Sequence, residues 1–270
     1  MAIITISRGS YSRGKVIAEK VAEKLGYTCI DRETIIEASE QYNIPEMKLV
    51  RAIRDAPSIL ERFGYGKEKY VAYFTASFLR QLKKDNVVYH GLAGHFLVEG
   101  IPHVLKVRII SDMEDRIELE MERESISRKE AQRILQSDDK QRRNWSKYLF
   151  GIDNADVSLY DLVLNIQNLT VDNAVSIICG IIELPDFRTT PESQKTLEDL
   201  LLACEVKVAL IDVKRDIDVS SNAGTVLVKT RGHSSQKERL IEEMKRIGQG
   251  VPGVKEVHIN VLPQFPEIDL

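Results

Sequence analysis

The chain has 270 residues, with 38 lysines and arginines against 41 aspartates and glutamates, and a formal net charge of −3 at pH 7. This balance excludes an overall electrostatic attraction to nucleic acid or to anionic lipid, so any anion site must be local. The length gives room for two domains, each with its own core.

The N-terminal segment and the cysteines indicate the cellular setting. Residues 1–10, MAIITISRGS, become polar too soon for a secretory signal, and no apolar run approaches the roughly 18 residues of a membrane span. Cys29, Cys179 and Cys204 are far apart, form no CxxC pair and are expected to be buried thiols. We therefore expect a cytoplasmic protein.

The first predicted unit is a strand, a loop and a helix. Residues 2–6, AIITI, form an apolar, β-branched run that is typical of a strand covered on both faces of a parallel sheet. Gly9, Gly14 and Lys15 then match GxxxxGK, in which backbone N–H groups surround a phosphate and the lysine reaches its outer oxygens. Apolar residues recur at helical spacing from Lys15 to Gly26. This order favours phosphate binding over an ordinary turn between a strand and a helix.

The second predicted strand ends in charged residues. Asp31, Arg32 and Glu33 follow the run YTCI, and the carboxyl ends of strands line the ligand crevice of an open α/β sheet. The alternative is that Asp31 only caps the helix that begins near Glu33.

Two further apolar strands are predicted within residues 85–97 and 103–110, with a turn or short helix between them. This order of elements predicts a three-layer α/β sandwich. His90 and His95 have no third metal ligand at a suitable spacing, so we expect His90 to end a strand and His95 to pack on a helix.

Residues 112–150 are highly charged and predict helices, the second opened by the capping pattern SRKE. Further along this helix, about two turns carry four basic residues, Lys140, Arg142, Arg143 and Lys147. Arginines on a mobile segment can neutralise the charge of a phosphoryl group in transfer while water is excluded. The alternative is a solvated helix whose basic residues pair with nearby acids.

Together these segments resemble the cytidylate-kinase-like family of P-loop proteins, which are relatives of the nucleoside monophosphate kinases. The resemblance covers residues 1 to about 183 and is carried by ITISRGSYSRGKVIAEKVAEKLG, CIDRETI, EDRIELEMERESISRKEA, DKQRRNWSKYLFG and LYDLVLNIQNLTVDNAV. It implies a P-loop kinase-like parallel sheet with helices on both faces, in a domain of residues 1–187.

The resemblance also implies roles for individual residues. ATP binding is implied for the loop residues Gly9, Ser10, Ser12, Arg13, Gly14 and Lys15. Stabilisation of the transferred charge is implied for four cationic residues, Lys15, Arg116, Arg142 and Arg143. Binding of a monophosphate acceptor such as CMP is implied for Asp31 and Arg32.

Three positions depart from the pattern of such kinases. Leu92 follows Gly91 where many relatives have an arginine for the acceptor phosphate. Val16 follows the loop lysine where a hydroxyl would bind Mg²⁺, and Ser10 or Ser12 could replace it only with unusual geometry. No aspartate ends the VVYH strand as a second magnesium partner. We therefore expect no metal held by side chains, and Mg²⁺ only through water and substrate oxygens.

A polar segment with two prolines, residues 184–195, precedes the second half, and we place a linker at residues 188–196. Residues 197–263 predict a small α+β domain in which NAGTVLVKTRG and GVPGVKEVHINV resemble the BON domain. That resemblance implies a module that binds a small ligand, a membrane or a protein, and we expect a regulatory or assembly role, including homo-oligomers. Its basic residues form either an anion-attracting face or an ordinary solvated one: Lys229, Arg231, Lys237, Arg239, Lys245 and Arg246.

The sequence thus supports two functions. The first is ATP-dependent phosphoryl transfer to a nucleoside monophosphate or a similar small acceptor. The alternative is a catalytically degenerate nucleotide sensor whose P-loop domain regulates, or is regulated by, the BON-like domain. Nucleic-acid binding is disfavoured by the net charge and by the single tryptophan near the basic segment.

Overall fold

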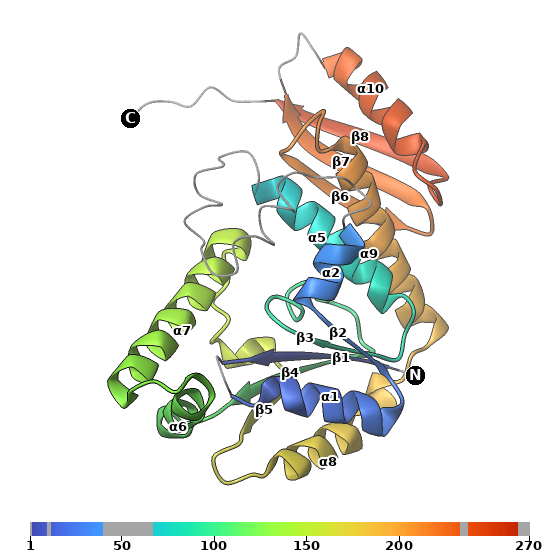
Figure 1. Cartoon of the computed structure of the whole chain (residues 1–270). Coiled ribbons are helices and arrows are strands. Elements are labelled where there is room, and N and C mark those ends of the chain that lie inside the picture. The colour runs from blue at the N-terminus through green and yellow to red at the C-terminus, as the bar shows by residue number, and fades with distance from the viewer. Residues whose placement is uncertain (1, 10–11, 40–66, 233–236, 264–270) are drawn as a thin grey trace.

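In a computed structural model, the described residues, 2–9, 12–39, 67–232 and 237–263, form two sheets with their covering helices (Figure 1). The larger sheet has five parallel strands in the order β2-β3-β1-β4-β5. These strands are β1 Ile3–Arg8, β2 Thr28–Asp31, β3 Val87–His90, β4 Val104–Ile110 and β5 Leu162–Asn165. The expected parallel α/β sheet is therefore confirmed.

Helices cover both faces of this sheet and give the three layers that the sequence predicts (Figure 1). One face is covered by α1 Gly14–Leu25 and α8 Val171–Ile182. The other is covered by α2 Arg32–Ser39, α5 Lys67–Leu82 and the first half of α9 Pro191–Leu210.

The central strand, β1, contributes side chains to both cores. Ile4 and Ile6 pack with α1 and α8, whereas Ile3 packs with the core on the α5 side. All three side chains are fully buried. A strand buried on both faces needs such a continuous apolar run, so the interpretation of residues 2–6 is confirmed.

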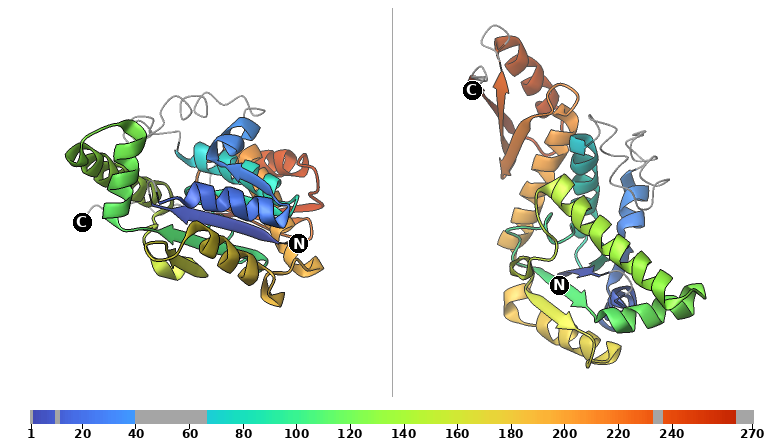
Figure 2. Two further views of the ribbon diagram at one scale, coloured as in Figure 1. Left: turned by 60° about the horizontal axis from the view of Figure 1, so that its bottom comes forward. Right: turned by 90° about the vertical axis from the view of Figure 1, so that its left-hand side faces the viewer.

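Two charged helices, α6 Met113–Glu124 and α7 Arg128–Phe150, stand beside the carboxyl ends of the strands (Figure 2). Ser127 caps α7, because its Oγ accepts a hydrogen bond from the Glu130 N–H at 3.3 Å. The capping pattern read from the sequence is thus confirmed. Gly151 ends the helix with a φ of 72°, a left-handed conformation that glycine adopts without strain.

Helix α9 joins the two sheets without a break (Figure 1). Thr190 caps its start by accepting a hydrogen bond from the Ser193 N–H at 3.1 Å, and Pro191 is its first residue. Residues 191–196, expected to belong to a linker, are therefore helical. The polar residues that suggested a linker are the cap and the first turns of a helix.

Both hydrophobic cores include residues of α9. Leu197 and Leu201 pack in the core of the larger sheet, and Val206 and Leu210 pack in the core of the smaller one. Ion pairs also join α9 to α5 and to the residue after it: Arg80–Glu205 at 2.5 Å and Lys83–Glu198 at 3.2 Å. The two parts of the chain therefore share one rigid element.

The smaller sheet contains the predicted hairpin and closing strand. Its order is β6-β7-β8, with β6 Ile217–Asn222, β7 Thr225–Gly232 and β8 Glu256–Pro263. β6 and β7 are antiparallel and are joined by Ala223 and Gly224, both at positive φ as in the primed turns of hairpins. Helix α10, Lys237–Gln249, connects β7 to the parallel strand β8 and packs with α9 on the inner face.

The cysteines agree only partly with the prediction that all three are buried thiols. All three cysteines are free; Cys179 is buried, whereas Cys29 and Cys204 are half-buried. Burial raises the pKa of Cys29 to about 11 and that of Cys204 to about 12, so both remain protonated at neutral pH.

Within the described ranges, we find no helix that combines the length and the apolar character required to cross a bilayer.

The shared helix predicts how the protein unfolds. Leu197→Ala is expected to lower the free energy of unfolding by about 2–5 kcal/mol, because it leaves a cavity in the larger core. Urea denaturation followed by circular dichroism measures this, with Leu184→Ala, at an exposed position, as the control. Because α9 belongs to both cores, we expect one transition. Two transitions, of which only one shifts, would contradict this prediction.

Candidate functional site

Two clefts open at the carboxyl edge of the larger sheet. The first, which we call the α2 cleft, has a volume of about 600 Å³ and lies between β1, the start of α1, α2, the end of β3 and α7. The second, the α6 cleft, has a volume of about 460 Å³ and lies between the end of β1, the end of β4, α6 and α7. This edge is where an open parallel sheet holds its ligands.

The loop between β1 and α1 is attached to the sheet through its backbone. The Gly9 N–H donates to the Ile109 carbonyl at 3.3 Å, and the Ser12 Oγ donates to the Gly9 carbonyl at 3.1 Å. Ser12 is 0% exposed, so its hydroxyl stabilises the loop from inside. Ser10, for which we predicted contact with ATP, lies outside the described residues.

The first turn of α1 presents backbone donors beside this loop. Its hydrogen-bond ladder begins with the Ile17 N–H and the Arg13 carbonyl, 3.1 Å apart. The N–H groups of Gly14, Lys15 and Val16 precede that bond, at the positions where a helix leaves its donors without intrahelical acceptors. Such a helix start attracts anions.

The α2 cleft brings together residues from distant parts of the sequence. Lys15, Asp31, Arg32 and Arg142 all line it. The Lys15 side chain is 60% exposed and lies 3.7 Å from Glu19. The predicted phosphate lysine, the predicted acceptor residues and one predicted arginine of α7 thus face the same space.

Asp31 caps α2, as the alternative interpretation held, and it also lines the cleft. Its Oδ1 accepts hydrogen bonds from the N–H and the Oγ1 of Thr34, both at 2.9 Å. Burial acts to raise the pKa of Asp31, but these hydrogen bonds and the nearby charges of His90 and Lys15 lower it below its usual value. Asp31 is therefore a carboxylate at neutral pH, able to accept hydrogen bonds from a ligand.

Arg32 is positioned by the only tryptophan of the sequence. Its guanidinium lies 5.6 Å from the centre of the Trp145 ring, within the range of a cation–π contact. Trp145 belongs to α7 and is 7% exposed, so the ring is fixed in the core beneath the cleft. The sequence analysis did not find this pair, because the two residues are 113 positions apart (145 minus 32).

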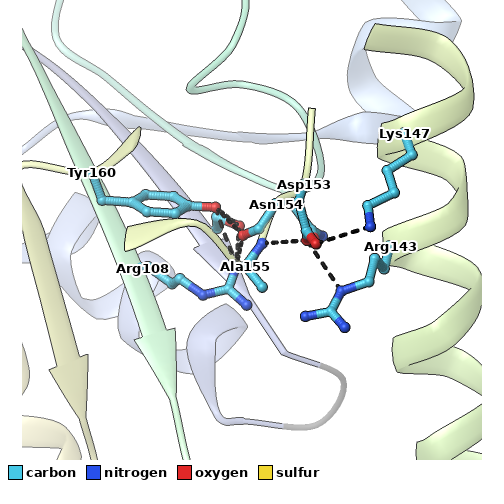
Figure 3. Close-up of polar contacts among 8 residues, drawn as sticks. Arg108, Arg143, Lys147, Asp153, Asn154, Ala155 and Tyr160 are labelled. Carbon is cyan, nitrogen blue, oxygen red and sulfur yellow. Dashed lines mark hydrogen bonds and ion pairs between the residues drawn. The ribbon is translucent and has the colours of Figure 1, made fainter. Parts of the chain in front are cut away.

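The other predicted arginines line the α6 cleft and are ion-paired. Arg116, 7% exposed, lies 2.8 Å from Asp139 of α7. Arg143 lies 3.1 Å from Asp153, which also lies 3.2 Å from Lys147 (Figure 3). These arginines thus pair with nearby acids, as the alternative interpretation held, and they also line a cleft.

A hydrogen-bond network holds the segment after α7 against the sheet (Figure 3). Arg108 Nη1 donates to the Asn154 carbonyl at 2.6 Å, and the Tyr160 hydroxyl donates to the same carbonyl at 2.8 Å. Nε2 of His95 lies 2.9 Å from that hydroxyl. This network fixes Asp153, which precedes Asn154, and with it the end of α7. None of these residues was singled out for this role, since the contacts join separate strands and loops.

The two histidines take different positions. His90 ends β3, as expected. His95 lies in a segment of turns and not on a helix, and it packs against Phe96 and Tyr160. His95 was expected to pack on a helix, but its ring contacts are its neighbour Phe96 and Tyr160, which precedes β5.

The described side chains do not fit a protein-held Mg²⁺. Val16 is 45% exposed at the position where such kinases provide a hydroxyl, and the Ser12 hydroxyl is buried inside the loop. Within the described ranges, no group of three or more histidines, cysteines or acids could hold a metal ion.

A loop with the GxxxxGK spacing that joins the central strand of a three-layer parallel sheet to a helix start, with a cleft on each side of that strand, is the arrangement of the P-loop kinase class. A family model, "Cytidylate kinase-like family", matches residues 3–168, and the chain belongs to this family. That match ends before α9 and the smaller sheet, so the BON-like resemblance stays a prediction.

Individual proteins show the same relationship. The cytidylate kinase of Methanopyrus kandleri is 31% identical over 109 residues, which cover 37% of this chain and 56% of that protein. The chain thus spans about half the length of that curated relative. The crystal structure of an uncharacterized protein from Eubacterium ventriosum has a TM-score of 0.53 and 21% identity, covering 67% of this chain and 98% of that one. This second likeness shows the fold alone.

Buried His95 predicts a loss of stability in acid. Burial, with the charges of Arg108 and Lys106, lowers the pKa of His95 to about 3, against an ordinary value of 6.5. Between these values the unfolded chain binds a proton that the folded chain excludes, so stability falls as the pH drops below 6.5. One such proton is worth about 1.4 kcal/mol per pH unit.

The variant His95→Gln is expected to reduce this dependence. The slope of its free energy of unfolding against pH, measured in urea between pH 6 and pH 4, should be smaller than the wild-type slope by the equivalent of about one bound proton. His258→Gln, at an exposed position, serves as the control. Equal slopes in the wild type and in His95→Gln would contradict the prediction.

Proposed function

We propose that the protein transfers a phosphoryl group from ATP to a nucleoside monophosphate, such as CMP, or to a similar small acceptor. The observation that supports this most is the meeting of two clefts at the end of β1, where Arg8 and Arg142 of α7 line both. A transferase of this kind must hold two substrates with their reacting atoms close together. Family membership points to the same class of reaction.

The donor phosphates are assigned to the start of α1. Three N–H groups and the Lys15 ammonium provide positive charge there. The α6 cleft, with Arg116 and Arg143, is on the other side of β1 from the α2 cleft and is assigned to the rest of the nucleotide. Gly9 and Arg13 belong to the same proposed site, in keeping with the resemblance.

The acceptor is assigned to the α2 cleft. The Asp31 carboxylate accepts hydrogen bonds from hydroxyl or amino groups, and the guanidinium of Arg32, fixed by Trp145, binds an anion. Arg142 lines both clefts and is placed to contact the phosphoryl group between them. In this proposal Mg²⁺ is carried by phosphate oxygens and water, because the described side chains provide no site.

A second candidate function is a nucleotide sensor without turnover. Leu92 lines the acceptor cleft without a charge, Val16 has no oxygen for Mg²⁺, and Arg116 and Arg143 are held by carboxylates. In either case, we infer that residues 197–263 form a BON-like regulatory module in a cytoplasmic protein. Helix α9 connects this module to α5, and α5 packs on α2 beside the acceptor cleft. The module would bind a small ligand or a protein, including a second copy of the chain.

Calorimetric titration with ATP tests the donor site. Lys15→Ala is expected to weaken binding about 10- to 150-fold, the value of one charge-assisted hydrogen bond of about 1.5–3 kcal/mol. Lys20→Ala is the matched control, because Lys20 lies on the same helix and pairs with Asp172. Equal affinity in Lys15→Ala and the wild type would exclude the proposed phosphate site.

The acceptor is then identified by a coupled assay for ADP release with each common nucleoside monophosphate. Transfer to at least one of them that is lost in Lys15→Ala supports the kinase. ATP binding without any transfer supports the sensor instead.

The ion pairs of Asp153 lead to a separate prediction. Asp153→Asn is expected to raise the affinity for ATP about 1.5- to 5-fold. In the wild type, Arg143 must break its ion pair with the Asp153 carboxylate in order to bind a phosphate, and an exposed pair is worth about 0.2–1 kcal/mol. The same titration measures it. Adding Arg143→Gln should abolish the gain, and a gain that persists would show that Arg143 does not contact the nucleotide.

A further inference from the structure

Arg8, the last residue of β1, lies where the two clefts meet. It lines both the α2 cleft and the α6 cleft. We propose that Arg8 binds the phosphate groups at this junction and replaces, from the neighbouring strand, the arginine that is absent at Leu92. This inference rests on the proposed function, in which the phosphoryl group passes between the clefts.

The packing of Gly14 defines the path of the Arg8 side chain. A Cβ atom at Gly14 would lie 2.8 Å from both Cβ and Cδ of Arg8, closer than real Cβ atoms approach. Only glycine leaves room there, so Arg8 crosses directly over the first residue of α1. Its guanidinium is thereby brought beside the helix start where the donor phosphates are assigned.

The strand register explains how Arg8 can line the same cleft as Leu92. Ile6 pairs with His90, and the Gly91 N–H donates to the Ile6 carbonyl at 3.1 Å. Arg8, two residues beyond Ile6, therefore extends past the same sheet edge as Leu92, and both line the α2 cleft. An arginine on β1 can provide the charge that a residue after β3 does not.

The charges around Arg8 suit an anion. Three other cationic side chains line the α2 cleft, and they come from α1, α2 and α7: Lys15, Arg32 and Arg142. Burial and then the charge of Arg8 lower the pKa of His90, which shows that the field of Arg8 reaches the end of β3. The acids of this cleft, Asp31, Glu33 and Glu37, all belong to the end of β2 or to α2. Phosphate would therefore be drawn toward the β1 and α7 side.

The chemistry at this position is a single displacement. An oxygen of the acceptor phosphate forms a bond to the γ-phosphorus of ATP, while the bond from that phosphorus to the bridging oxygen breaks and ADP leaves with the electron pair. An ionised phosphate acceptor releases no proton. Arg8 donates hydrogen bonds to the equatorial oxygens as their charge changes, a contribution that for other arginines is worth about 10³–10⁵ in kcat.

The test compares Arg8→Gln and Arg8→Lys with the wild type and with Arg188→Gln. Arg188 is exposed and follows α8 at the opposite end of the sheet, where neighbouring Thr189 bonds to Asp85 before β3. Binding of inorganic pyrophosphate is followed by the fluorescence of Trp145, the only tryptophan. We expect at least a 10-fold loss of affinity in Arg8→Gln, partial recovery in Arg8→Lys and no change in Arg188→Gln.

Turnover with ATP and the best acceptor is measured on the same samples, and urea denaturation shows whether each variant is folded. We expect kcat to fall at least 100-fold in Arg8→Gln, with a smaller rise in the KM for ATP. Unchanged pyrophosphate affinity, or kcat within threefold of the wild type, would overturn the role of Arg8 and leave the proposed function standing. A wild type that transfers no phosphoryl group fails the proposed function, and pyrophosphate affinity then decides on Arg8 alone.

Discussion

The parallel pairing of β1 with both β3 and β4 is the constraint on which the site depends. In a parallel sheet every strand ends at the same edge, so the residues that follow β1, β2, β3 and β4 meet there although they are far apart in sequence. The central position of β1 puts the β1–α1 loop between two neighbours, and a cleft opens on each side. Helix α7 then covers both clefts from one direction.

The sequence revealed the features that depend on local signals. An apolar run identified β1, and the residue types at helix and hairpin ends identified the Ser127 cap and the turn at Gly224. The place of Asp31 beside the loop of Lys15 also followed, because the order of elements fixes which edge the strand ends share. The place of Arg142 at this edge was implied only by the family resemblance. Capping by Asp31 and a place in the cleft were weighed as alternatives, yet one carboxylate does both.

Contacts between distant elements could not be predicted in this way. The stacking of Arg32 on Trp145 and the carbonyl of Asn154 shared by Arg108 and Tyr160 depend on how α7 and its following loop lie against the sheet. Arg8 was overlooked because the motif begins at Gly9. The motif spacing also does not show that the Arg8 side chain packs against Gly14, where a larger residue would collide with it. The helical linker was missed since polar composition describes both a loop and an exposed first turn.

The continuity of α9 has a consequence for how this architecture can be taken apart. A module joined by a loop can be excised, exchanged or appended in another protein as an independent cassette. Here a cut within residues 188–196 would leave the larger sheet without Leu197 and Leu201, and a cut after them would divide the helix that carries Val206. Neither cut leaves both cores intact, so in this chain the two sheets cannot be separated without exposing apolar residues of one of them.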